Sequence, residues 1–245
     1  MNAKLTIDIG NSRTKLAVFT GKSIQHIEYL DKLTISHIRR TIKKFDVSYV
    51  IVASVQHLTK SMSSFIGSSE NIFLLSTEMK LPFEIKYKTP KTLGLDRLSG
   101  MAGAWSLFPR QNSLVVDAGT CIKYDIIRED AKYLGGNIAP GLTMRLKAMH
   151  LLTDRLPQVE PYERYLAMGT DTKSALQVGA CTGALMEVRG FIEEYKKTFD
   201  KLNILLTGGD GHFFVNNLKT KIFAAPNLVL QGLNEILDYN VQKQG

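Results

Sequence analysis

Two short stretches of this chain place an aspartate, a glycine and a small polar residue at the end of an apolar run. They are residues 8–12 (DIGNS) and residues 117–120 (DAGT). A tight turn with a glycine presents backbone N–H groups that can bind an anion such as phosphate. Phosphate would repel Asp8 and Asp117 unless a cation lay between them, because hard cations take oxygen ligands from both groups. The stretches therefore predict two phosphate-binding turns with an associated cation.

The side chains of the first turn fit this chemistry. Gly10 lets the backbone approach a phosphate, Asn11, Ser12 and Thr14 can donate hydrogen bonds, and Lys15 adds positive charge. An ordinary β-hairpin would also explain one such turn, since Gly and Asn tolerate left-handed backbone angles. Two turns at matching positions of a repeat favour phosphate binding over two unrelated hairpins.

The elements that must position these turns are expected in the same arrangement twice. The two aspartates lie a little under half the chain apart, and Gly119 and Thr120 take the same roles in the second turn. Strands are expected at 14–19, 24–29, 47–54, 71–76, 121–128, 131–138, 203–207 and 221–225, and helices at 34–45, 57–66, 142–152, 172–199, 210–218 and 227–240. This order predicts an α/β fold in which a mixed sheet flanked by helices is built twice, with a ligand-binding cleft between the halves.

A third glycine-rich loop lies between a predicted strand and a predicted helix, in residues 203–214 (NILLTGGDGHFF). Glycines at such a junction permit close approach of a flat ring or a phosphate, and a helix N-terminus favours an anion. A glycine turn before an aspartate-capped helix is the alternative, because the loop has neither of the common nucleotide-binding glycine patterns.

A helix that ends before Pro109 begins near Asp96 and Arg97. Asp96 is either a helix N-cap or a reactive carboxylate. A cation at a helix N-terminus opposes the helix dipole, so Arg97 suggests an anionic partner such as a carboxylate; a surface salt bridge is the alternative. Tyr87 suits either a substrate contact or edge-strand packing. Residues 133–142 (YLGGNIAPGL) suit either a turn or a loop that lines a substrate.

The composition is that of an ordinary globular protein: 245 residues, 44% hydrophobic and 22% charged. No apolar stretch reaches the ~20 residues that cross a bilayer.

The N-terminus leads directly into a strand and only Cys121 and Cys181 are present, so we expect no signal peptide and a reduced, cytoplasmic protein. The net charge of +8 suits an anionic ligand or a plain basic surface. The basic run at 39–44 is expected on the outer side of an amphipathic helix, without a zinc or RNA-binding signature.

The duplicated fold, with its Asp-x-Gly turns and its Thr-Gly-Gly loop, resembles the superfamily of acetate kinase, sugar kinases, heat-shock chaperones and actin. Within that superfamily, the chain resembles type III pantothenate kinase, the bacterial enzyme that begins coenzyme A synthesis. The stretches that carry the resemblance are 87–97 (YKTPKTLGLDR), 117–125 (DAGTCIKYD), 133–142 and 168–184 (MGTDTKSALQVGACTGA). The resemblance implies two ribonuclease H-like domains of the actin-like ATPase type, at residues 1–111 and 112–245. The second would hold the second phosphate turn and an adenosine loop.

The resemblance also implies roles for the first turn. This turn would bind the phosphates of ATP, with Asp8 near a magnesium ion, through Asp8, Ile9, Gly10, Asn11, Ser12, Arg13, Thr14 and Lys15. Thr120 would also contact ATP, and Asp117 would bind a monovalent cation, potassium or ammonium. Cys121, Lys123, Tyr124 and Ser12 depart from the usual family sequence. Lys123 could change the electrostatics of the cation or phosphate site, which bears on the potassium requirement.

For pantothenate, the resemblance implies that Asp96 is the general base and that the substrate is contacted by Tyr87, Gly94, Leu95, Asp96, Arg97 and Thr172. It further implies a homodimer whose pantothenate pocket lies near the subunit interface, with no membrane or nucleic-acid partner. Two alternatives stay open at this stage. One is another small-molecule kinase of the superfamily. The other is a nucleotide-dependent regulatory or binding protein whose basic charge contacts nucleic acid.

Overall fold

The computed structural model describes residues 2–241, which form two compact units. The first unit holds residues 2–109, 131–133 and 227–241 of the described chain, and the second holds residues 110–130 and 134–226. Within residues 2–241, no helix has both the length and the apolar character that crossing a bilayer requires.

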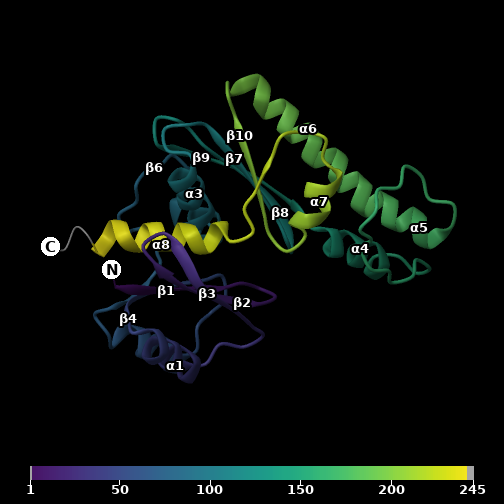
Figure 1. Ribbon diagram of the computed structural model, residues 1–245. Helices are drawn as coiled ribbons and strands as arrows, with labels where there is room; N and C mark the ends of the chain where they lie inside the picture. Colours follow the sequence, from purple (N-terminus) through teal and green to yellow (C-terminus); the bar gives the residue numbers. More distant parts are fainter. Residues whose placement is uncertain (1, 242–245) are drawn as a thin grey trace. The chain divides into compact units, whose positions relative to one another are not determined.

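The first unit is built on a five-stranded sheet (Figure 1). Its strands are β1 (Ala3–Ile9), β2 (Thr14–Thr20), β3 (Ser23–Leu30), β4 (Val47–Ser54) and β5 (Ile72–Leu74), and its first two helices are α1 (Ile35–Phe45) and α2 (Lys60–Gly67). The strand order is β3-β2-β1-β4-β5, with β1, β2 and β3 antiparallel and with β4 parallel to both β1 and β5.

The second unit repeats this topology. Its strands are β7 (Ser113–Ala118), β8 (Cys121–Ile127), β9 (Lys132–Pro140), β10 (Asn203–Thr207) and β11 (Phe223–Ala224), in the order β9-β8-β7-β10-β11. Here too the first two strands are antiparallel and the fourth strand is parallel to the first and the fifth. The first two residues of β9 belong to the first unit, where they pair with β6 (Glu84–Ile85). The predicted duplication of a mixed α/β unit is therefore confirmed.

The helices of the second unit differ from the prediction in one place. They are α4 (Leu142–Leu151), α5 (Thr172–Gln177), α6 (Gly183–Thr198) and α7 (Gly211–Asn217). The continuous helix expected at 172–199 is wrong in detail, because a π-helical segment at Val178–Thr182 separates α5 from α6. The Thr182 hydroxyl donates to the Leu166 carbonyl at 2.8 Å and lies 2.7 Å from the Tyr162 hydroxyl. These tertiary contacts accompany the change of helical pitch, and the helical pattern of the sequence does not contain them.

The remaining helices, α3 (Leu95–Leu107) and α8 (Leu228–Val241), pack against each other in the first unit (Figure 1). A Cβ atom at Gly232 would lie 1.7 Å from the Ser99 carbonyl oxygen, so the two helices approach at a distance that only glycine allows. The sequence-based division placed residues 227–245 in the second domain. By its contacts, the described part of that segment, 227–241, groups with the first unit.

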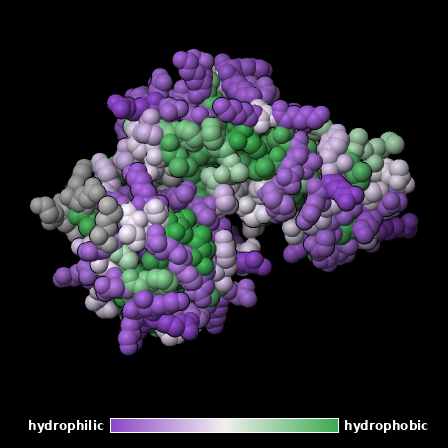
Figure 2. All heavy atoms as spheres, in the orientation of Figure 1, coloured by the Kyte–Doolittle hydropathy of each residue, from purple (hydrophilic) through white to green (hydrophobic). Residues whose placement is uncertain are grey.

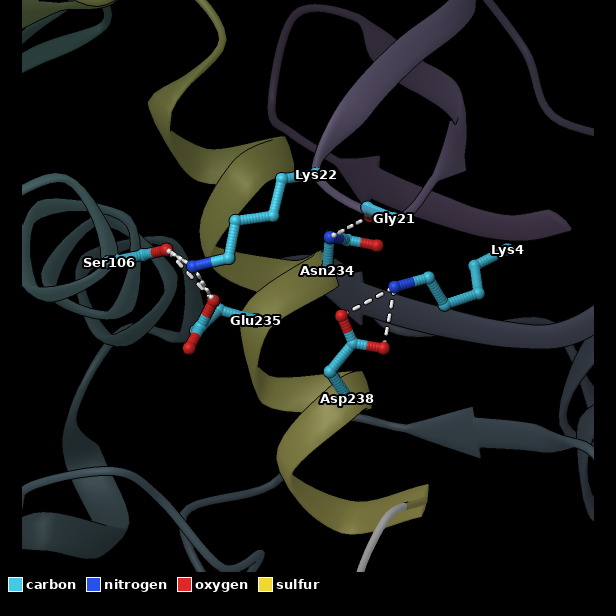
Figure 3. Close-up of polar contacts among 7 residues, drawn as sticks. All are labelled: Lys4, Gly21, Lys22, Ser106, Asn234, Glu235 and Asp238. Atoms are coloured by element: carbon cyan, nitrogen blue, oxygen red, sulfur yellow. Dashed lines mark hydrogen bonds and ion pairs between the residues drawn. The ribbon is translucent and has the colours of Figure 1, made fainter. Parts of the chain in front are cut away.

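Polar contacts also join α8 to β1, to the turn after β2 and to α3, all within the first unit (Figure 3). Lys4 of β1 forms an ion pair with Asp238 at 2.5 Å, and Asn234 donates to the Gly21 carbonyl at 3.1 Å. Ser106 of α3 donates to the Glu235 carboxylate at 2.8 Å. Because these partners are far apart in sequence, the place of α8 is a property of the tertiary fold.

The central strands β1 and β2 of the first sheet are buried on both faces, which explains the continuous apolar run at 16–19 in β2. Alternate side chains of a strand point to opposite faces. Leu16 and Val18 belong to the core that includes Ile38 of α1, whereas Ala17 and Phe19 pack with Leu230 of α8. The basic residues 39–40 and 43–44 are exposed on the outside of α1, as predicted. The surface over α1 is mostly hydrophilic in Figure 2. The second unit has its own core, centred on β7, β8, β10 and α6.

Candidate active site

The first predicted phosphate turn joins β1 to β2 and is tight. The Gly10 N–H donates to the Arg13 carbonyl at 3.1 Å. A Cβ atom at residue 10 would lie 3.0 Å from that same oxygen, closer than most side-chain contacts. Residues 11–13 are exposed, so the turn presents its polar groups at the surface of the unit. This geometry suits an anion.

The end of β4 supports this turn. The Gln56 side chain donates to the Gly10 carbonyl at 2.6 Å and to the Asn11 carbonyl at 3.4 Å. The Val55 N–H donates to the Ile9 carbonyl at 3.1 Å. Sequence reasoning missed Gln56, because its partner lies 46 residues away and no local pattern connects them.

A pocket of about 190 Å3 opens beside the turn, within the first unit. It is lined by the turn, by the start of α2 and by the loops after β3 and β4: Ile9, Gly10, Asn11, Ser12, Arg13, Thr14, Asp31, Lys32, Leu33, Ser54, Gln56, His57, Leu58, Thr59 and Met62. The pocket therefore contains most of the residues expected to bind ATP phosphates.

Asp8 lies beneath the turn and is 9% exposed. It stands directly opposite Lys15 on the neighbouring strand. Among residues 2–241, no group of three or more His, Cys, Asp or Glu side chains is placed to hold a metal ion. Magnesium is usually held by one or two carboxylates together with substrate phosphates. A single carboxylate at a phosphate turn fits that mode of binding, and no resident metal cage is needed.

Five of the six residues expected to bind pantothenate, all except Thr172, lie at or beside the start of α3. Gly94 is the N-cap, so the alternative in which Asp96 itself is the N-cap is wrong. Asp96 lies in the first turn of the helix, where its carboxylate accepts the Arg97 N–H at 2.8 Å. The Arg97 side chain is buried, and its guanidinium carbon lies 5.3 Å from the centre of the Tyr87 ring. A cation–π contact therefore joins two residues that the sequence singled out separately.

The second predicted phosphate turn joins β7 to β8 in the second unit. The Gly119 N–H donates to the Cys121 carbonyl at 3.0 Å, and Thr120 is exposed. Asp117 stands directly opposite Lys123 on the neighbouring strand, and the Asp117 carboxylate is 2.6 Å from the Lys123 ammonium. The sequence indicated that Lys123 would alter this position, and the structure forms an ion pair there.

Two further loops pack against the second turn. The Gly141 N–H donates to the Thr120 carbonyl at 3.1 Å, and a Cβ atom at residue 141 would lie 2.1 Å from the Gly119 carbonyl oxygen. Gly208 has φ +94°, and a Cβ atom there would lie 2.1 Å from the Ala118 carbonyl oxygen. The third glycine-rich loop and the end of residues 133–142 thus both pack against the second turn.

A partly buried hydrogen-bond network joins residues next to these loops. The Tyr124 hydroxyl donates to Glu187 at 2.9 Å, and Arg145 donates to Glu187 at 2.7 Å and to the Pro140 carbonyl at 2.8 Å. Burial, and then the hydrogen bond to Glu187, raise the pKa of Tyr124 above its ordinary value. Tyr124 therefore stays protonated and structural. Sequence reasoning noted it only as a departure from the family pattern.

Thr172 lies in the second unit, at the first position of α5, and is exposed. The residue before it, Asp171, caps the helix by accepting the Ser174 N–H at 3.0 Å. This hydrogen bond is the main reason why the pKa of Asp171 is lowered. Thr172 thus belongs to a different unit from Tyr87, Asp96 and Arg97.

Solved structures share this duplicated fold. A chain from Campylobacter jejuni, described as a Baf family transcriptional activator, has a TM-score of 0.62 at 23% identity, with 97% of this chain and 99% of that chain covered. Component A of (R)-2-hydroxyglutaryl-CoA dehydratase from Acidaminococcus fermentans has a TM-score of 0.56 at 14% identity, with 99% of each chain covered. At these identities the likeness concerns the fold.

Proteins with similar sequences identify the family of this chain. Type III pantothenate kinase from Flavobacterium johnsoniae is 41% identical, covering 97% of this chain and 98% of its own. The enzyme of the same name from Bacteroides fragilis is 40% identical, covering 96% of this chain and 98% of its own. The family model described as type III pantothenate kinase matches residues 4–194, which include both turns and the start of α3. The chain therefore belongs to the type III pantothenate kinase family.

Proposed function

We propose that this chain phosphorylates pantothenate with ATP, the reaction for which its family is named and the first step of coenzyme A biosynthesis. The observation that carries the proposal is the cluster at the start of α3. There a carboxylate on the helix N-terminus, a buried guanidinium and an aromatic ring lie together, in a chain of this family. Neither alternative, another small-molecule kinase or a regulatory protein, accounts for both the cluster and the family.

Pantothenate has a carboxylate at one end and a primary hydroxyl at the other. In the proposal, Arg97 binds the carboxylate, since its planar guanidinium matches that group with two parallel hydrogen bonds. Its contact with the Tyr87 ring at 5.3 Å fixes the plane of the guanidinium before the substrate arrives. Gly94 and Leu95 provide backbone contacts at the helix start, and Thr172 is a further substrate contact.

Asp96 is the proposed general base. Its hydrogen bond from the Arg97 N–H holds the carboxylate in one orientation. Asp96 takes the proton of the pantothenate hydroxyl while the hydroxyl oxygen attacks the γ-phosphorus of ATP. The new O–P bond forms as the bond to the bridging oxygen breaks, and ADP leaves. Positioning and electrostatics carry most of the catalysis in such phosphoryl transfers.

The first turn, residues 8–15, is proposed to bind the ATP phosphates through its backbone N–H groups, its hydroxyls and Lys15. Thr120 and the third glycine-rich loop are proposed to contact the nucleotide. Magnesium, when bound with ATP, neutralises phosphate charge, and Asp8 is the carboxylate that would hold it. A potassium or ammonium ion was expected at Asp117, but that carboxylate is already paired with Lys123.

We further propose a cytoplasmic homodimer. Each chain would hold two ribonuclease H-like repeats, 1–111 and 112–245, with residues 227–241 of the second repeat packed in the first unit. Leu151, Leu152 and Met168 are 75%, 82% and 74% exposed, which favours a subunit contact on the second unit. Sedimentation equilibrium of the wild type and of a Leu151→Glu, Leu152→Glu variant tests the contact. A dimeric variant would exclude these residues from the interface.

The activity is tested with a coupled assay of ADP release, with and without pantothenate, and with phosphorus NMR of the product. We expect ADP release that depends on pantothenate and a phosphomonoester on its hydroxyl. If a sugar is phosphorylated while pantothenate is not, the other small-molecule kinase replaces this proposal. ATP hydrolysis that no alcohol stimulates would instead favour the regulatory protein.

A further inference from the structure

An ion pair occupies the position where the family resemblance implies a monovalent cation. The Asp117 carboxylate and the Lys123 ammonium are 2.6 Å apart, on directly opposite positions of β7 and β8. Side chains directly opposite on an antiparallel pair project from the same face and are the closest cross-strand neighbours. The pair is therefore set by the register of two central strands.

The pair is also shielded from solvent. The Asp117 and Lys123 side chains are 18% and 16% exposed. Exposed ion pairs are loosely held and screened by salt, whereas partly buried pairs are screened much less. Displacing the ammonium from Asp117 would leave a partly buried charge without its partner, which is unfavourable.

The pair lies at the second turn. Asp117 comes two residues before Gly119, and the neighbouring Ala118 carbonyl accepts the Asp210 N–H at 2.9 Å from the third glycine-rich loop. The ammonium of Lys123 thus places a fixed positive charge next to the loops proposed to contact the nucleotide. A lysine ammonium is a compact point charge with three N–H donors, the same chemistry as an ammonium ion.

We propose that the Lys123 ammonium permanently replaces the exchangeable monovalent cation at Asp117, so that this chain works without added potassium or ammonium. A second cation at Asp117 would be repelled by the lysine beside it. The inference rests on the proposed function for its activity readout. Its binding and stability readouts are independent of that function.

The first experiment needs only the wild type. Its kcat/KM for ATP is measured at constant ionic strength in potassium, ammonium, sodium and choline chloride. We expect values that agree within about twofold, because the positive charge is covalently attached. A rate that falls about tenfold or more when choline replaces potassium would overturn the inference.

The second experiment uses Lys123→Met, which keeps much of the apolar stem and removes the charge. We expect its kcat/KM in choline to fall by about tenfold or more, the range for a hydrogen bond to a charged group, and to recover in potassium or ammonium. The melting temperature of the variant is expected to rise with potassium and not with choline. Lys197→Met, on an exposed lysine of α6, removes one charge from the same unit and is the matched control.

Both readouts can contradict the inference. The inference is wrong if the Lys123→Met variant stays inactive in every salt. It is also wrong if potassium changes neither the activity nor the melting temperature of the variant, because Lys123 would then not replace a cation. If the variant does not fold, Lys123→Gln replaces it. The wild-type measurements in the four salts still test the inference. If the wild type phosphorylates no pantothenate in any salt, the proposed function fails. ATP titrations of the wild type in the four salts then test the inference.

Discussion

The guanidinium of Arg97 lies over the ring of Tyr87, with its central carbon 5.3 Å from the ring centre. The two residues come from different elements, since Tyr87 follows β6 and Arg97 lies in the first turn of α3. The aromatic face restricts the guanidinium plane, and burial of Arg97 shields the group from water. This arrangement is suited to recognise one carboxylate in one orientation.

The first prediction concerns substrate choice. We expect pantothenate to be preferred over its alcohol analogue pantothenol by about one to two orders of magnitude in kcat/KM. A hydrogen bond to a charged group contributes roughly 1.5–3 kcal/mol, and ~1.4 kcal/mol is tenfold. Arg97→Ala should remove nearly all of this preference, and Arg97→Lys part of it. If the Arg97→Ala variant still strongly prefers pantothenate over pantothenol, another residue binds the substrate carboxylate.

The second prediction concerns the proposed base. Asp96→Asn should lower kcat by roughly 10²–10⁴-fold, the usual contribution of a general base, while ATP binding stays nearly unchanged. Asparagine can still accept the Arg97 N–H, so the start of the helix is kept. Steady-state kinetics and an ATP titration measure the two effects. A loss in kcat below about tenfold would leave Asp96 a structural residue at the helix start.

The third prediction concerns magnesium. Asp8→Asn should raise the magnesium concentration that gives half-maximal activity, because an uncharged amide is a weaker ligand for a hard cation. A loss of ~1.4 kcal/mol would raise it tenfold. Asp46→Asn is the control: Asp46 is an exposed C-cap of α1 with φ 49°, where asparagine fits equally well. If both variants need the same magnesium concentration for half-maximal activity, Asp8 does not bind magnesium.

The fourth prediction uses two adjacent glycines of the third loop. Gly208→Ala should destabilise the protein by about 1–3 kcal/mol and raise the KM for ATP, because φ is +94° and the new Cβ atom would meet the Ala118 carbonyl. Gly209→Ala is the matched control, since a Cβ atom there meets nothing within 4 Å. Thermal melts and ATP kinetics compare the two variants. If they behave alike, the fit of the loop to the second turn does not matter.

The fifth prediction concerns pH. Burial raises the pKa of Asp210, and the charge of His212 opposes that rise only partly. Because the folded pKa lies above the unfolded value, this group stabilises the fold at low pH and loses that contribution as pH rises through the folded pKa. Asp210→Asn should therefore melt at a higher temperature than the wild type at pH 7. The difference should vanish below the ordinary aspartate pKa of about 3.9. If the difference in melting temperature between Asp210→Asn and the wild type does not change with pH, the raised pKa of Asp210 is not its cause.

The sequence by itself determined the duplicated order of elements and the positions of the two turns. Apolar runs that end in Asp-x-Gly are local patterns, and each strand and turn is fixed largely by residues close in sequence. The start of α3 belongs to this class as well, because Asp96 and Arg97 are neighbours. The place of Arg97 at a helix start suggested an anionic partner, which stays a prediction.

Only the tertiary structure decided which residues hold these local pieces in place. The support of the first turn by Gln56, the ion pair of Asp117 with Lys123, and the contact of Arg97 with Tyr87 each join different elements. The same holds for the close approach of Gly232 to Ser99, which groups α8 with the first unit. Such contacts depend on strand register and helix packing, which sum many weak interactions over the whole unit. A single sequence therefore predicts where the site lies along the chain, and the packing of the elements fixes its geometry.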